Sequence, residues 1–482
     1  MASPAPFDPL DLAAHSRSAI AASQREDWGS AIAHLRVALA IAPQVAESWA
    51  NLAAAMQRIG RLEDADRLAQ QALAMKPALA AAWNMRGLVA LDQGRHDEAR
   101  RHLSKALELD PRFALAHMNL GICEQAAGRD DAALESLTHA LELDPALGSA
   151  HYNIGALHHK RGRHEEAAGE YRRAIALREH DAQSHFNLAL ALFAKGAFDE
   201  AWREYAWRAQ RREHAAVLRR EGRDRVAIHA EQGLGDNLFF LRFAPALRER
   251  GVTLDFVGDA RLHPMLARTG LFDALARHVD ELPPMPRDVM LAGDVPSGAV
   301  AVPPLSLAPD TARLDTMRAR LASLGPAPRI ALAWRAGEPR SGRIENLFKE
   351  IPVRALGEAL RGKQATWIAI QRDPAMGEVE ALSGAIGAPV HDLSAVNRDL
   401  EDALALLAAV DEYAGVSSTL VHLAAGAGTP TRVLVPFPPE WRWMESGERS
   451  PWFPRASVYR QSPDGDWSKA LERLAADLAT SR

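Results

Sequence analysis

A spacing of 34 residues recurs through the first half of the chain and limits what this half can fold into. Glycine keeps this spacing at Gly60, Gly94, Gly128, Gly162 and Gly196. Alanine keeps it in two registers, Ala31, Ala65, Ala99, Ala133, Ala167 and Ala201, and Ala38, Ala72, Ala106, Ala140 and Ala174. Proline keeps it at Pro43, Pro77, Pro111 and Pro145. Glycine permits a tight turn, alanine lets two helices approach, and proline ends a helix. The spacing therefore predicts a row of similar helix pairs.

Six repeats follow from this spacing, near residues 11–44, 45–78, 79–112, 113–146, 147–180 and 181–214. The register resembles that of the tetratricopeptide family, whose helix pairs stack into a superhelix with a concave groove. The outer repeats match less well, because Glu26 replaces the glycine of repeat one and repeat six runs into Trp202, Tyr205 and Trp207. We expect an all-α tetratricopeptide superhelix over residues 11–214.

One position in the first helix of each pair carries asparagine, a residue that helix propensity does not favour. In successive repeats it reads Asn51, Met85, Asn119, Asn153 and Asn187. A carboxamide both donates and accepts, so it can pair with the backbone of an extended peptide. This ladder resembles the one in the groove of nucleocytoplasmic O-GlcNAc transferase, and Met85 interrupts it. Peptide binding by the four asparagines is one interpretation, and hydrogen bonding within the array is the other.

Short apolar runs alternate with helical patterns in the second half of the chain. Charged, unpatterned residues 215–225 predict a linker before two α/β units, residues 226–325 and 328–482. The expected strands are 226–230, 254–257, 289–292, 329–334, 365–370, 412–416 and 432–435. Such alternation indicates parallel sheets, and ligands of these sheets bind beyond the carboxyl ends of the strands.

A glycine-rich turn, residues 231–236, joins the first expected strand to a helix that should end at Gly251. Gly233 and Gly235 lie in this turn, and Asp236 follows them at the start of the helix. Unpaired backbone N–H groups at a helix start attract anions. The turn therefore predicts a site that combines anion binding with one carboxylate. The alternative is an ordinary helix that Asp236 caps.

Polar residues also follow three strands of the second unit, at Arg335, at Gln371 and Arg372, and at Ser417, Ser418 and Thr419. The last three open an expected helix over residues 419–427. Hydroxyl groups and free N–H groups at a helix start can bind phosphate. Helix capping alone is the other interpretation, and the two are compatible.

Four segments of the second half together resemble the heptosyltransferase-like GT-B glycosyltransferases found behind bacterial tetratricopeptide arrays. They carry Gly-Leu-Gly-Asp, Val-Ser-Ser-Thr-Leu-Val-His-Leu, Trp-Arg-Trp and Ser-Pro-Trp-Phe-Pro, within residues 232–245, 416–424, 435–443 and 450–454. The resemblance covers nearly all of residues 226–480. It implies a GT-B fold of two Rossmann-like units, an activated nucleotide sugar as donor, and neither a metal nor another cofactor.

The resemblance also implies roles for single residues. Asp236 matches the proposed catalytic base, and Lys349 matches a cation that neutralises the leaving phosphate. The other donor-binding positions that it implies are Gly233, Gly235, Trp334, Arg335, Gln371, Ser417, Ser418, Thr419 and His422. Ser417 replaces an aspartate of the family, and the loop over residues 340–349 is altered. Both departures leave the identity of the donor open.

Composition sets limits on the partners. Lys and Arg number 57, Asp and Glu number 62, and the net charge of −5 argues against nucleic acid. The one cysteine, Cys123, excludes a disulfide within the chain and a multi-cysteine metal site. We find no signal-peptide pattern and no apolar run that could span a membrane, which indicates a cytoplasmic protein.

We therefore expect a cytoplasmic protein O-glycosyltransferase that modifies Ser or Thr of a polypeptide held by the repeats. Bacterial proteins of similar layout modify flagellin, and some use nonulosonic acids activated as cytidine monophosphate. Flagellin is thus the expected acceptor, and such a CMP-sugar is one candidate donor. Two alternatives stay open. One is a non-catalytic scaffold with a degenerate transferase half, and the other is transfer of sugar to a glycan or lipid.

Overall fold

The computed structural model describes residues 11–208, 224–295, 302–337 and 349–480. The chain forms two compact units, Met1–Leu157 with Gly169–His180, and His158–Ala168 with Asp181–Arg482. Among the helices in the described ranges, none is long and apolar enough to cross a membrane. The expected linker, residues 215–225, and the altered loop, residues 340–349, lie almost wholly outside the described residues.

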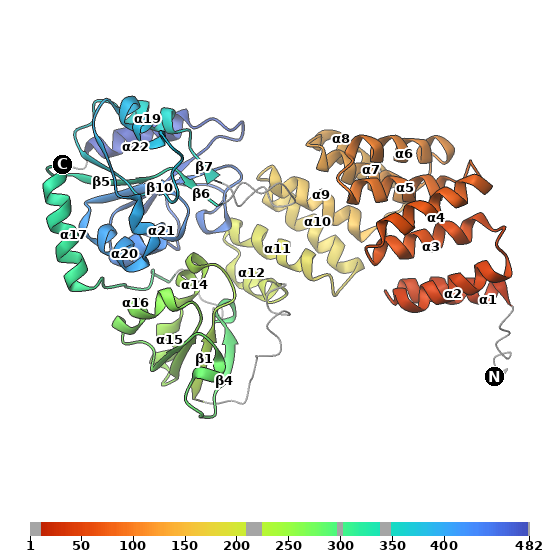
Figure 1. The fold of residues 1–482 in the computed structure, drawn as a ribbon, viewed down its shortest axis with the longest axis horizontal. Helices are drawn as coiled ribbons and strands as arrows, with labels where there is room; N and C mark the ends of the chain where they lie inside the picture. Colours follow the sequence, from red (N-terminus) through yellow and green to blue (C-terminus); the bar gives the residue numbers. More distant parts are fainter. Residues whose placement is uncertain (1–10, 209–223, 296–301, 338–348, 481–482) are drawn as a thin grey trace. The chain divides into compact units, whose positions relative to one another are not determined.

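Paired helices make up the described part of residues 11–208 (Figure 1). They are α1 (Leu12–Gln24), α2 (Trp28–Ile41), α3 (Ala46–Arg58), α4 (Leu62–Met75), α5 (Ala80–Asp92), α6 (His96–Leu109), α7 (Ala114–Ala126), α8 (Asp130–Leu143), α9 (Gly148–Lys160), α10 (His164–Leu177), α11 (Ala182–Lys195) and α12 (Phe198–Tyr205). The prediction of a helical repeat array is confirmed.

The repeated residues occupy the positions that their chemistry requires. All five repeated glycines have a positive φ, between 69° at Gly162 and 84° at Gly196. Glu26, which replaces the glycine of the first repeat, also has a positive φ of 58°. The alanines of both registers are fully buried between helices. Glycine allows the turn and alanine allows close helix packing, so the 34-residue spacing has a direct structural cause.

A four-stranded parallel sheet in the order β3-β2-β1-β4 forms the first α/β region (Figure 1). Its strands are β1 (Arg225–His229), β2 (Thr253–Val257), β3 (Ala274–Ala276) and β4 (Asp288–Leu291). Its helical segments are α14 (Leu234–Leu241), α15 (Ala244–Glu249), η2 (Ala260–Leu262), α16 (His263–Arg268), η3 (Val279–Glu281) and η4 (Ala292–Asp294). The three expected strands are present, and β3 is an addition of only three residues.

The helix that we expected to run from the glycine-rich turn to Gly251 is divided into α14 and α15. Pro245 lies in the first turn of α15. Proline has no N–H to donate and fits the first turn of a new helix better than the interior of a long one. The prediction of one continuous helix is therefore wrong.

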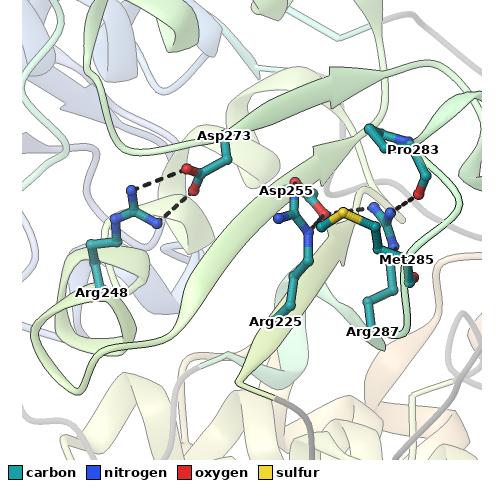
Figure 2. A network of polar contacts seen from close by, with 7 residues as sticks. All are labelled: Arg225, Arg248, Asp255, Asp273, Pro283, Met285 and Arg287. Carbon is teal, nitrogen blue, oxygen red and sulfur yellow. Dashed lines mark hydrogen bonds and ion pairs between the residues drawn. The ribbon is translucent and has the colours of Figure 1, made fainter.

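A buried carboxylate ties the strands of this sheet together (Figure 2). Asp255 in the middle of β2 is fully buried, and two arginines donate to it. Arg225 donates from Nε at 2.8 Å and Nη2 at 2.6 Å, and Arg287 donates from Nη1 at 2.6 Å. Two cations and several hydrogen bonds compensate the burial of this charge.

A six-stranded parallel sheet in the order β12-β11-β10-β5-β8-β9 forms the second α/β region. Its strands are β5 (Arg329–Ala333), β8 (Thr366–Ala369), β9 (Val390–Asp392), β10 (Glu412–Val416), β11 (Thr431–Val435) and β12 (Ala456–Arg460). Its helical segments are α17 (Thr311–Leu324), α18 (Val353–Leu360), α19 (Glu378–Ile386), η6 (Ser394–Arg398), α20 (Leu400–Ala409), α21 (Thr419–Ala427), η7 (Trp441–Trp443) and α22 (Ser468–Thr480). The antiparallel pair β6 (Arg335–Ala336) and β7 (Lys349–Glu350) accompanies the sheet. The prediction of parallel α/β structure in the second half is confirmed.

Candidate functional site

The starts of helices α14 and α21 contact each other. A Cβ atom on Gly235, in the first turn of α14, would lie 3.1 Å from Cδ2 of His422 and 3.4 Å from Cα of Thr419. Only glycine permits this approach without a shift of the neighbours. Because α14 follows β1 and α21 follows β10, the carboxyl edges of the two sheets supply the two helix starts. The positive ends of two helix dipoles therefore lie close together.

Side-chain capping does not account for the residues at these helix starts. Gly233 is the N-cap of α14 and Ser418 is the N-cap of α21, and neither makes a side-chain cap hydrogen bond. The hydroxyl of Ser417 donates instead to Oε2 of Glu440 at 2.8 Å. Side-chain capping of α21 therefore does not explain why Ser417 and Ser418 occupy these positions.

Lys349 and Glu440 form a second part of the site. Nζ of Lys349 donates to the carbonyl oxygen of Ser417 at 2.9 Å and forms an ion pair with Glu440. Burial alone would raise the pKa of Glu440, but the charges of Lys349 and Arg442 and two hydrogen bonds hold this pKa below its usual value. Glu440 is thus a carboxylate in a positive environment. Glu440 lies within residues 435–443, but no pattern in the sequence indicated that it would be part of the site.

Asp236 forms an ion pair with Arg442. The guanidinium of Arg442 also lies over two rings, 4.9 Å from the centroid of Phe239 and 4.5 Å from that of Trp441. The side chain of Asp236 keeps 34% of its surface exposed, against 11% for Arg442. The carboxylate thus stays open to solvent while aromatic rings hold its partner. The role of Arg442 was also missed, although Trp-Arg-Trp had been noted.

His422 is buried beside these charges. Burial is the largest cause that lowers its pKa well below the ordinary value, and the charges of Arg442, Arg242 and Lys349 add to it. The imidazole is therefore neutral at neutral pH and does not act as a cation.

Three other predicted donor residues lie around the end of β5. Oε1 of Gln371 accepts from the backbone N–H groups of Trp334 at 3.0 Å and Arg335 at 2.8 Å, and its Nε2 donates to the carbonyl oxygen of Arg335 at 3.1 Å. Trp334 is fully buried in the core, and Arg335 pairs with Glu378 at 2.9 Å. The side-chain amide of Gln371 thus binds the backbone at the end of β5. The same amide oxygen and nitrogen are the atoms that a ligand would otherwise contact.

The asparagine ladder is only partly free to bind a peptide. Nδ2 of Asn119 donates to Oδ1 of Asn84 at 2.9 Å, and Nδ2 of Asn153 donates to the carbonyl oxygen of Ser149 at 2.7 Å. Asn51 is exposed. At Asn119 and Asn153 the structure therefore contains the bonds within the array that our second interpretation requires. Peptide binding stays a prediction.

A buried charge cluster fixes the turn from its other side. Arg208 donates to Glu231 from Nη2 at 2.7 Å and from Nε at 3.0 Å, and to Asp294 at 2.8 Å. The backbone N–H of Gly293 also donates to Glu231 at 2.8 Å. Because Glu231 opens the glycine-rich turn, Arg208 ties the chain after α12 to the segment that carries Asp236. Among the described residues, no group of three His, Cys, Asp or Glu is arranged to hold a metal ion.

The first half matches family models of the same repeat. Models described as tetratricopeptide repeat match residues 51–112 and 84–147, and one described as TPR repeat matches residues 157–196. These matches confirm tetratricopeptide repeats, an architecture that stacks into a scaffold for protein interaction.

One curated relative and several solved structures are similar to this chain. The chain is 26% identical over 292 residues to Protein FlbA of Caulobacter vibrioides, which covers 54% of this chain and 48% of FlbA. The chain thus spans about half the length of the curated relative. A thermophilic TPR protein of Thermus thermophilus, TTC0263, is 21% identical with a TM-score of 0.35, over 38% of this chain and 98% of that one. Pseudomonas aeruginosa pilF is 24% identical with a TM-score of 0.34, over 40% of this chain and 88% of that one. TM-scores this low give no information on function.

Proposed function

We propose that this chain is a protein O-glycosyltransferase. Its repeats would hold a polypeptide, and the site around Asp236 would move a sugar from a nucleotide donor to a Ser or Thr hydroxyl. The contact of Gly235 with His422 and Thr419 carries the proposal, because it sets the partly exposed carboxylate of Asp236 beside the start of α21. The resemblance to GT-B glycosyltransferases implies the same arrangement.

The residues of this site match the charges that develop during glycosyl transfer. The acceptor oxygen forms a bond to the anomeric carbon, the bond from that carbon to the phosphate oxygen breaks, and its electron pair leaves with the phosphate. Asp236 takes the proton of the acceptor hydroxyl. Lys349, Arg442 and the free N–H groups of α21 stabilise the negative charge on the leaving phosphate. In this scheme Arg442 exchanges Asp236 for the phosphate, which frees the base.

The resemblance also suggests the substrates. Flagellin is the proposed acceptor and a CMP-activated nonulosonic acid is the proposed donor. Ser417 in place of the family aspartate changes the donor side, because its hydroxyl is engaged with Glu440. A donor unlike that of the heptosyltransferases is consistent with this change.

Donor binding can be tested by thermal denaturation of the full chain with a panel of nucleotides and nucleotide sugars. A true donor raises the unfolding midpoint, since it binds only the folded state. We expect Lys349→Gln to abolish the rise and Lys469→Gln, an exposed lysine on α22, to leave it unchanged. The acceptor protein is then incubated with the stabilising donor, and its intact mass is measured. If no compound shifts the midpoint and no acceptor gains mass, the chain is not a transferase.

The scaffold interpretation is favoured by one observation. Lys349 already has Glu440 and the carbonyl of Ser417 as partners, and Asp236 already has Arg442. A degenerate site could be stabilised by such internal pairing. In that case the repeats would still capture a protein partner, but the mass of this partner would not change with any donor.

A further inference from the structure

A cavity of about 750 Å³ lies at the carboxyl edge of the four-stranded sheet, on the glycine-rich turn. Its walls come from the residues that follow β1, β2 and β3 and from the first turn of α14, which are all parts of the first α/β region. Asp236 does not line it. This volume falls in the range of small-molecule sites, which is about 300–1,000 Å³.

The positive charge that faces this cavity exceeds the negative charge. Arg261 and Asp259 both line it, and they pair with each other at 2.6 Å. Arg277 also lines it and is exposed. Its backbone N–H donates to Oε2 of Glu281 at 2.8 Å, but among the described residues no carboxylate forms an ion pair with its guanidinium. Gly233, the uncapped N-cap of α14, lies on the same wall. One unmatched cation and one helix start therefore favour an anion.

A buried acceptor on the cavity wall points to a ligand that also donates hydrogen bonds. Asn237 lines the cavity and is only 2% exposed. Its Nδ2 donates to the carbonyl oxygen of Gln232 at 2.9 Å, which fixes the orientation of the amide. Its Oδ1 is buried and accepts no hydrogen bond from the residues that the structure describes. Buried polar atoms normally have a partner, so this oxygen is an acceptor available to a hydroxyl or N–H group of a ligand.

We infer that this cavity binds a small polyhydroxylated anion, either a sugar acid or a sugar phosphate. The anionic group lies against Arg277 and the start of α14, and a hydroxyl group donates to Oδ1 of Asn237. The cavity shares Gly233 with the predicted donor-binding residues but is not lined by Asp236, so its binding is measured without nucleotide, and a failure there leaves the glycosyltransferase proposal to its own test.

Binding can be measured by isothermal titration calorimetry on the full chain without nucleotide. The probes are D-glucuronate and D-glucose 6-phosphate, with D-glucose and inorganic phosphate as the comparison. We expect at least one of the two sugar anions to bind at least 10-fold more tightly than both comparison compounds. The stronger of the two tells whether carboxylate or phosphate is preferred.

Two variants connect this binding to the cavity. Arg277→Gln should weaken it at least 5-fold, whereas Arg250→Gln, an exposed arginine of the same region outside the cavity, should not change it. Arg277 is exposed, so its loss will not unfold the chain. The inference is wrong if neither sugar anion binds, if inorganic phosphate binds as tightly as both of them, or if Arg277→Gln binds like the unaltered protein.

Discussion

Two charged clusters flank the same glycine-rich turn, and they differ in their access to water. The first cluster holds Glu231, at the start of the turn, and consists of Arg208, Glu231 and Asp294. Their side chains are 0%, 0% and 7% exposed. The second cluster holds Asp236, at the end of the turn, and its partner Arg442. The side chains of these two residues are 34% and 11% exposed. A charge sealed from water is held by its partners and cannot exchange them, whereas a partly exposed charge can. The first cluster therefore suits a structural role and the second suits chemistry.

Both clusters act on one short stretch of backbone. Glu231 and Asp236 are the first and last residues of the turn, so a rigid anchor at one end sets the position of the proposed base at the other. Tyr205 on α12 adds to the anchor, since Nε2 of Gln232 donates to its hydroxyl at 2.7 Å. The last helix pair of the array is thus part of the support of the proposed site.

The largest effect is expected in the exposed cluster and in catalysis. Asp236→Asn keeps the shape but removes the base, so the transfer rate should fall about 10²–10⁴-fold. Its free energy of unfolding should change by no more than about 1 kcal/mol, because the lost ion pair is partly exposed. Initial rates and urea denaturation curves measure the two effects. An unchanged rate would show that Asp236 is not the base.

The buried cluster should respond in the opposite way. Arg208→Met leaves the fully buried carboxylate of Glu231 without the cation that pairs with it, so the free energy of unfolding should fall by about 3–5 kcal/mol. The control is Arg248→Met, which breaks the exposed pair of Arg248 and Asp273 seen in Figure 2 and should lose about 1 kcal/mol or less. Urea denaturation measures both. If both variants lost the same free energy of unfolding, burial would not distinguish the cluster of Arg208 from an exposed ion pair.

Much of the fold could be predicted from the sequence, because its signals are local. The 34-residue spacing predicted the helix pairs, and apolar runs predicted β1, β5 and β10. Pro245 was visible, but its effect on the long helix was not taken into account. The three-residue strand β3 is too short to show a pattern.

The partners in the site could not be predicted in the same way. Arg442 and Asp236 are 206 residues apart in the chain, and Arg208 and Asp294 are 86 apart. Local patterns do not specify which distant charges pair, because folding brings them together. Asp236 and Lys349 were found through motifs, and their partners Arg442 and Glu440 were not.

Acid should weaken the folded chain at His422, which is buried beside the exposed pair of Asp236 and Arg442. His422 has a lowered pKa in the folded chain, whereas an unfolded histidine has a pKa of about 6.5. Below that pH the unfolded chain binds a proton that the folded chain does not, so stability falls as the pH falls. His422→Gln should remove about 2 kcal/mol of the loss between pH 7 and pH 5. Denaturation curves at both pH values test this, and Arg248→Met, which breaks only the exposed pair with Asp273, should keep the slope of the unaltered protein.

The smallest net effect on stability should come from Gly235→Ala, where two forces oppose each other. Replacing a helical glycine by alanine stabilises a helix by roughly 0.5–1 kcal/mol. Gly384→Ala in α19 should show this gain in full, because nothing lies within 4 Å of the added Cβ. At Gly235 the Cβ would meet His422 and Thr419, so α14 or α21 must shift by a few tenths of an ångström.

The packing penalty should therefore cancel the gain of Gly235→Ala, while the shift separates Asp236 from the start of α21 and lowers the transfer rate. Gly384→Ala should leave that rate unchanged, since it lies outside the proposed site. Thermal midpoints and initial rates of both variants decide the matter. Gly235→Ala could instead gain as much stability as Gly384→Ala and keep its transfer rate. The close approach of α14 and α21 would then have no part in catalysis, because the site would tolerate the shift of these helices.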